Sequence, residues 1–257
     1  MIPSRIRKVL STMANHQVRA LLMGGQACVF YGAAEFSRDI DLLLLADGAN
    51  LARLEAALDD LQAERIAVPP LTLDCLQRGH AVHFRCHHPE AADIRVDVMS
   101  RLRGAEEFEL LWTRRTTLTD TDGTVYELLS LPDLVQAKKT QRSKDWPMLE
   151  RLLEAHYLRH RGDATADQQR FWLQELRTPE LLVEAAQRWP QLAEQVARQR
   201  PLLLLAKSGQ LDPLREALSA EEQTERQHDR TYWQPLKAEL ERLRHSARAR
   251  PPIDKRV

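Results

Sequence analysis

The chain has no long apolar stretch and no excess of charge of either sign. Its longest apolar runs, such as residues 202–206, are far shorter than the roughly 20 residues that a membrane-spanning helix needs. The opening Met1–Arg5 is not followed by the apolar core of a secretion signal. We therefore expect a protein that is not attached to a membrane and that works in the cytosol.

Cysteine and aromatic residues are scarce. Three scattered cysteines do not form the spacing pattern of a disulfide framework.

Because 37 basic residues balance 37 acidic ones, no overall positive field attracts nucleic acid. The five tryptophans are better explained as core or interface anchors than as platforms for stacked bases. At 257 residues with 43% hydrophobic content, the chain is long enough for a sizeable core and more than one compact unit.

The most informative feature is a pair of acidic residues at the start of an apolar run. In Asp39-Ile40-Asp41, followed by residues 42–45 that are all leucine, alternate strand residues share a face, so the two carboxylates stand side by side. Two carboxylates at that spacing repel each other unless a cation lies between them, and their oxygens suit Mg²⁺ or Mn²⁺. Upstream, Gly24-Gly25 ends another apolar run. A backbone without Cβ atoms can approach a phosphate closely there.

These motifs resemble the nucleotidyltransferase superfamily, which has the DNA polymerase β-like fold. The similarity covers roughly residues 18–155 and looks closest to a bacterial branch that includes toxin-type and small-molecule nucleotidyltransferases. Its most specific parts are Tyr31-Gly32 and Asp39-Ile40-Asp41. The resemblance implies an α+β domain with a small mixed sheet and helices on one side, and transfer of a nucleoside monophosphate from a nucleoside triphosphate to an acceptor hydroxyl.

The resemblance also implies the residues of the site. Asp97 lies in an alternating stretch, residues 92–99, that suits the third carboxylate on a neighbouring strand, and residues 131–145 resemble the family's lysine-bearing helix. Asp97 also suits a surface ion pair with Arg95, and Lys138, Arg142 and Lys144 suit a solvated helix face. Asp145 is better explained as a partner of a nearby base than as a catalytic group. The implied catalytic and metal-binding residues are Asp39, Asp41 and Asp97, and the implied nucleotide-binding residues are Gly24, Gly25, Ser37, Lys138 and Lys144.

One departure from the family pattern keeps a second class of function open. Where an arginine is common before the acidic pair, this chain has Glu35, and an arginine occurs at Arg38 instead. An acidic residue there does not help to bind a triphosphate. The first interpretation is an active, metal-dependent enzyme whose acceptor is a tRNA end, a protein hydroxyl or a small molecule, and a toxin-like role suits the branch that the chain resembles. The second is a binding or regulatory protein, with a protein partner, that keeps the fold and has lost turnover. A nuclease that uses the same carboxylates is a distant third.

A zinc site and an RNA-binding tail are weaker readings of two other segments. His80, Cys86 and His88 share one face of a strand but lie too far apart along it to converge on a metal. Residues 237–257 are rich in bases and suit RNA contact or an ordinary helix end equally well.

Hydrophobic periodicity predicts mixed helices and strands up to about residue 130, and only helices afterwards. Residues 161–257 are therefore expected to form a helical domain that follows a nucleotidyltransferase-like domain of residues 1–160. A turn at 120–123 predicts a hairpin, and the segment 162–167 is a plausible linker. Asn50 is expected to cap a helix that runs to Arg65. Later helix starts are expected at Thr178-Pro179, Asp212-Pro213 and Ser219-Ala220.

Overall fold

The computed structural model describes residues 3–120 and 123–249, which fall into two compact units. The first unit takes in the chain up to Ala27, Phe36–Asp133 and the chain from Tyr232 onward. The second takes in Cys28–Glu35 and Leu134–Thr231. Each unit thus combines segments that are distant in the sequence. An independent helical domain over residues 161–257 stays a prediction.

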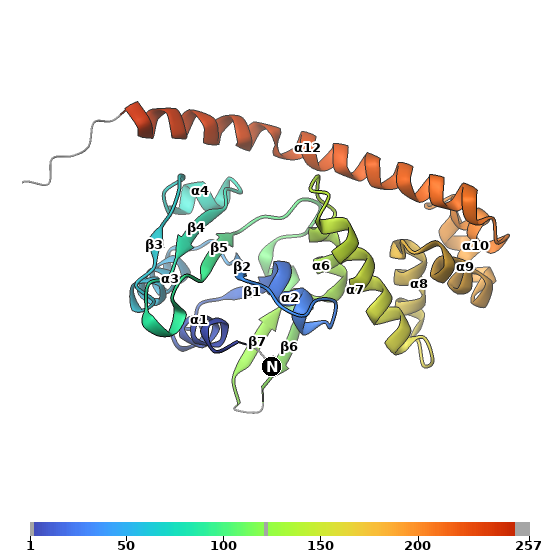
Figure 1. The fold of residues 1–257 in the computed structure, drawn as a ribbon, viewed down its shortest axis with the longest axis horizontal. Helices are drawn as coiled ribbons and strands as arrows, with labels where there is room; N and C mark the ends of the chain where they lie inside the picture. The colour runs from blue at the N-terminus through green and yellow to red at the C-terminus, as the bar shows by residue number, and fades with distance from the viewer. Residues whose placement is uncertain (1–2, 121–122, 250–257) are drawn as a thin grey trace, which may run out of the picture. The chain divides into compact units, whose positions relative to one another are not determined.

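The first unit is an α+β fold around a seven-stranded mixed sheet with the order β3-β4-β5-β2-β1-β7-β6 (Figure 1). The pairs β2–β5 and β1–β7 are parallel, and the other neighbours are antiparallel. The elements up to the end of the sheet are α1 (Ser4–Asn15), β1 (Ala20–Met23), α2 (Gly24–Phe30), β2 (Asp39–Leu44), α3 (Gly48–Asp60), β3 (Glu64–Arg65), α4 (Leu73–Gln77), β4 (Val82–Arg85), η1 (Pro89–Ala91), β5 (Arg95–Met99), α5 (Phe108–Thr113), β6 (Thr116–Thr119) and β7 (Val125–Leu128).

Alternation along the central strands separates a core face from a polar face. Ile40 and Val96 are completely buried, and Leu42 and Val98 are at most 3% exposed. Burying each such side chain stabilises the fold by about 1.5–3 kcal/mol, so this face fixes which way the strands lie. The intervening residues, Asp39 and Asp41 on β2 and Asp97 on β5, consequently share the opposite face.

The helix after β2 begins and ends at residues other than those predicted from the sequence. Helix α3 begins at Gly48, because the Asp47 side chain accepts a hydrogen bond from the Asn50 amide at 2.7 Å. Asn50 is therefore inside the helix, 2% exposed, and its side chain bonds the backbone of Arg19 and Leu45. The helix ends at Asp60 and not at Arg65, because residues 64–65 pair with β4. The β6–β7 hairpin is confirmed, although residues 121 and 122 of its predicted turn lie outside the described residues.

After the sheet, the described residues form helices only, as the periodicity predicts. Thr165 begins one of them with a capping box, in which it and Gln168 bond each other's backbone amides. The expected start at Thr178-Pro179 is confirmed, whereas Ser219 lies inside a continuous 39-residue helix and starts nothing. The helices are α6 (Leu131–Lys138), α7 (Asp145–His160), α8 (Ala166–Glu175), α9 (Pro179–Arg188), α10 (Pro190–Ala197), α11 (Leu203–Lys207) and α12 (Leu211–Ala249); α2, α6 and α12 belong in part to each unit. No helix within the described ranges combines the length and hydrophobicity needed to cross a bilayer.

An aromatic cluster forms part of the core of the second unit. Trp172 is completely buried, stacks on Trp189 with ring centroids 5.8 Å apart, and meets Tyr157 edge to face. Its indole nitrogen donates a hydrogen bond of 3.0 Å to Nδ1 of His156. These two tryptophans are therefore structural, and His156 is held as a neutral acceptor.

That acceptor role predicts a loss of stability in mild acid. Burial, with the nearby charges of His160 and Arg159, lowers the pKa of His156 to about 4 from its ordinary value of 6.5. Between these two values the unfolded chain binds a proton that the folded chain does not. The contribution of neutral His156 to the free energy of unfolding is therefore complete above pH 6.5 and is lost as the pH falls toward 4. Because the ring is partly exposed, we expect about 1–2 kcal/mol less stability at pH 5 than at pH 7.

Urea unfolding of the wild type and of His156→Gln at pH 5 and pH 7 measures this effect. Glutamine can still accept the indole hydrogen bond but does not titrate in this range. The variant is expected to lose less stability between the two pH values. An identical pH dependence in both proteins would show that His156 is not responsible.

Candidate functional site

The register of the central strands brings two predicted carboxylates together. Asp41 of β2 lies directly opposite Asp97 of the parallel strand β5. Residues opposite each other on neighbouring strands point to the same face, with Cβ atoms about 4.5–5.5 Å apart. Asp39 stands two residues earlier on that face and is exposed, whereas Asp41 is half-buried. The polar face of the sheet thus carries all three predicted carboxylates in neighbouring positions.

Asp97 has two basic neighbours. Its Oδ1 accepts a hydrogen bond of 2.7 Å from Nε of Arg95 and lies 2.8 Å from Nδ1 of His83. His83 is opposite Asp97 on β4, and its Nδ1 also lies 3.1 Å from Nη2 of Arg95. Burial alone would raise the pKa of Asp97, but the bonds from His83 and Arg95 outweigh it, so the pKa lies below its ordinary value. Asp97 is therefore ionised at neutral pH, and the ion pair with Arg95 expected as an alternative is present.

The glycine turn lies against the acidic pair. Gly24 has a φ of +67°, and a Cβ added to it would lie 1.8 Å from Oδ2 of Asp41. At Gly25 a Cβ would lie 2.8 Å from Oγ of Ser37, which donates a hydrogen bond of 3.0 Å to the Asp39 carbonyl. The missing side chains therefore leave the backbone in direct contact with the residues of the acidic motif. This explains physically why glycine occupies position 24.

The predicted phosphate-binding lysines belong to the second unit, whereas the carboxylates belong to the first. Nζ of Lys138 lies 3.4 Å from Oδ1 of Asp145, and both side chains are largely buried. Asp145 also accepts hydrogen bonds from Thr140 and Arg142. Burial opposes ionisation of Asp145, but these partners, Lys138 foremost, lower its pKa below the ordinary value. Lys138 thus has a structural partner, while Lys144 is exposed just before α7.

Two findings concern the residues that were considered as metal ligands. Within residues 3–120 and 123–249, no three His, Cys, Asp or Glu side chains are grouped closely enough to hold a metal ion. Cys86, a member of the weak zinc reading, is completely buried, and burial raises its pKa to about 11. It is therefore a neutral thiol at physiological pH and a poor zinc ligand.

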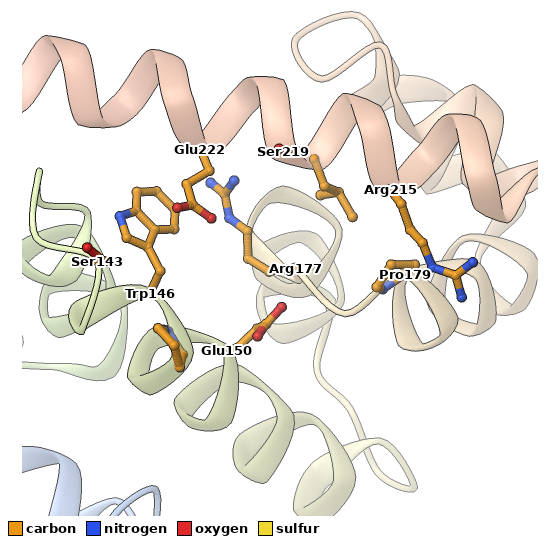
Figure 2. A pocket seen from close by; sticks show the side chains of 10 residues that line it. Ser143, Trp146, Glu150, Arg177, Pro179, Arg215, Ser219 and Glu222 are labelled. Atoms are coloured by element: carbon orange, nitrogen blue, oxygen red, sulfur yellow. The ribbon is translucent and has the colours of Figure 1, made fainter.

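A hollow of about 450 Å³ lies in the second unit, and the sequence analysis did not anticipate it (Figure 2). Its walls come from α7, the start of α9 and α12, and carry Trp146, Glu150, Arg177 and Glu222. Arg177 is 7% exposed at its side chain, lies over the Trp146 ring, and pairs with Glu221 at 2.9 Å. These contacts explain why Arg177 is buried: its side chain helps to pack the helices together.

The sequence analysis also missed His83 and the basic residues beside it. Residues 79–88 were considered for zinc on the face of His80, Cys86 and His88, but the alternation places His83 and Arg85 on the other face. The signal that could have found them was this alternation combined with a strand pairing to residues 94–99. The sequence of either segment alone does not predict that the two strands pair.

Comparisons with known proteins add little to this geometry. No protein-family model and no curated protein matches the sequence. Among solved structures, the chain is similar to the crystal structure of JHP933 from Helicobacter pylori, with a TM-score of 0.39 and 13% identity over 91% of this chain and 94% of that one. A similarity at this level supports no argument about fold or function.

Proposed function

We propose that the chain is a metal-dependent nucleotidyltransferase with a DNA polymerase β-like fold, which transfers a nucleoside monophosphate from a nucleoside triphosphate to an acceptor hydroxyl. The observation that carries the proposal is the cross-strand pairing of Asp41 with Asp97, with the backbone of Gly24 against Asp41. Two carboxylates in this relation, beside a glycine turn, are elements that this chemistry requires.

The donor atoms suit a hard divalent cation. Asp39, Asp41 and Asp97 offer only carboxylate oxygens, which Mg²⁺ and Mn²⁺ prefer, and they share one face of the sheet. We propose that these three residues would hold the ion, although no three acidic, histidine or cysteine side chains among the described residues are grouped around one position in this structure. When bound, the ion supplies positive charge that offsets the charge of the triphosphate. The remaining functions belong to residues of the chain.

The backbone amides of Gly24 and Gly25 are proposed to bind the phosphates, in exchange for the contacts that Asp41 and Ser37 make with these glycines in this structure. The Ser37 hydroxyl is a further donor, once it releases the Asp39 carbonyl. Neutralisation of phosphate charge by Lys138 and Lys144 stays a prediction from the resemblance, and Lys138 already pairs with Asp145. In-line positioning and charge stabilisation would then supply most of the rate enhancement.

Asp97 is proposed to accept the proton of the acceptor hydroxyl, because it is ionised and stands beside Asp41. Its hydrogen bonds from His83 and Arg95 involve Oδ1, and they hold the carboxylate in one orientation. The acceptor, whether an RNA end, a protein hydroxyl or a small molecule, and a toxin-like role remain predictions.

One observation favours the alternative of a binding protein without turnover. Arg95 already neutralises Asp97 at 2.7 Å, and Glu35 takes the place of a common arginine. A carboxylate paired in this way binds a metal ion less readily, because the ion must compete with the guanidinium. Such a protein would bind nucleotide or metal but would transfer nothing.

Thermal unfolding with each nucleoside triphosphate, with and without Mg²⁺, tests binding. A preferred triphosphate at about 100 times its Kd is expected to add about 2.7 kcal/mol of stability, and to do so only with the metal. Incubation with the α-³²P-labelled triphosphate, total RNA and lysate protein then separates the two functions. Label on an acceptor supports the enzyme, whereas binding without label supports the alternative. No stabilisation by any triphosphate would contradict the enzyme and would leave the alternative only as a protein that does not bind nucleotide.

A further inference from the structure

Two arginines face each other beside the carboxylates. Arg85 of β4 lies directly opposite Arg95 of β5, and Arg95 lies opposite Asp39 of β2. This row runs across the polar face two residues from the row formed by Asp41, Asp97 and His83, and the strands that carry it are neighbours in the sheet (Figure 1). Like charges directly opposite each other on paired strands are destabilising. The arrangement therefore calls for a compensating negative charge.

The protein compensates only one of the two arginines. Arg95 gives Nε to Asp97, and this bond, together with the charges of Asp97, Asp39 and Asp41, raises its pKa. The Arg85 side chain, in contrast, makes no hydrogen bond or ion pair within the described part of the chain. Glu64 is opposite Arg85 on its other side, but its carboxylate is 81% exposed and lies 3.6 Å from His87. Arg85 is thus a half-buried guanidinium with no acid of its own.

We infer that Arg85, together with Nη1 of Arg95, which bonds neither Asp97 nor His83, forms a phosphate-binding subsite beside the carboxylates. A guanidinium presents parallel N–H groups that fit two oxygens of one phosphate, and two guanidiniums in register bind a polyphosphate more tightly than one. The subsite supplies from β4 and β5 the positive charge that Glu35 fails to supply from the loop before β2. This inference rests on the proposed function for the identity of the ligand. The phosphate belongs either to the triphosphate of the nucleotide or to the backbone of an RNA acceptor.

Calorimetric titration of the full chain with inorganic tripolyphosphate tests the subsite without any transfer reaction. Arg85→Gln is expected to weaken binding at least about tenfold, because it removes a charged hydrogen-bonding partner. Arg85→Lys is expected to restore only part of the loss, since lysine keeps the charge and loses the paired donors. Arg53→Gln is the matched control: Arg53 is exposed on α3, and its one contact is a 3.5 Å bond to the Gln17 carbonyl. It is expected to bind like the wild type.

A second titration with an oligoadenylate RNA that lacks a 5′ phosphate distinguishes the two sources. If Arg85→Gln weakens only tripolyphosphate binding, the subsite serves the nucleotide, and if it weakens only RNA binding, the subsite serves the acceptor backbone. The inference is overturned if Arg85→Gln binds both probes within twofold of the wild type, or if the wild type binds neither. Failure of the proposed function is a separate outcome. It would appear as binding that depends on Arg85 without label transfer to any acceptor.

Discussion

Asp41→Asn is expected to reduce nucleotidyl transfer on the order of 10³-fold or more while leaving the protein folded. Asparagine has nearly the same volume and keeps one oxygen, but it removes the charge that stands between Gly24 and Asp97. Loss of that charge weakens binding of a divalent cation directly. It also removes both the repulsion from neighbouring carboxylates and the attraction to Arg95, so the melting temperature without ligand is expected to change little.

Initial rates of label transfer and melting curves, each with and without triphosphate and Mg²⁺, measure the two effects of Asp41→Asn separately. Asp59→Asn is a matched control, because Asp59 is exposed on α3 and its side chain makes no hydrogen bond or ion pair within the described ranges. Asp41→Asn is expected to lose the stabilisation by triphosphate that the wild type and the control show. Retention of transfer within tenfold of the wild type would remove Asp41 from the catalytic site.

Gly24→Ala is expected to lower the stability by about 2–5 kcal/mol and to abolish triphosphate binding. A left-handed φ costs an alanine about 1–2 kcal/mol, and forcing a methyl group into packed surroundings adds about 1–3 kcal/mol. Here the new Cβ would fall 1.8 Å from Oδ2 and 2.7 Å from Cβ of Asp41, so rotation of the carboxyl group alone cannot relieve the overlap. The carboxylate must move away from its place opposite Asp97.

Two other glycines provide graded controls for Gly24→Ala in urea unfolding and triphosphate titrations. At Gly48 nothing lies within 4 Å of an added Cβ, so alanine at the start of α3 is expected to be neutral or slightly stabilising. At Gly25 the nearest atom is the movable hydroxyl of Ser37, so an intermediate effect on binding is expected. Equal behaviour of Gly24→Ala and Gly48→Ala would contradict the close approach of the glycine turn to Asp41.

The properties that could be read from residue order are local ones. Alternation in Asp39–Leu44 and Arg95–Met99 correctly assigned Ile40, Val96 and Val98 to the core face, because side chains on a strand repeat every two residues. The hairpin and the all-helical character after residue 131 follow from turn residues and periodicity in the same way. Local prediction was wrong where a different contact determined the outcome. Asn50 does not cap the helix, because its side-chain amide forms hydrogen bonds with the backbone of Arg19 and Leu45 instead.

The arrangement of the candidate site depends on pairing between distant segments. Strand β2 pairs with β5, more than fifty residues later, and a shift of one residue in that register would remove Asp41 from its place opposite Asp97. The same pairing sets Arg95 and His83 against Asp97 and leaves Arg85 opposite Arg95. Periodicity within one strand reports which residues share its faces, and it contains no information about which strand lies beside it. Short motifs therefore identified the candidate carboxylates. Which residues lie beside them, and which of those residues form ion pairs with them, depends on how the strands pair in the sheet.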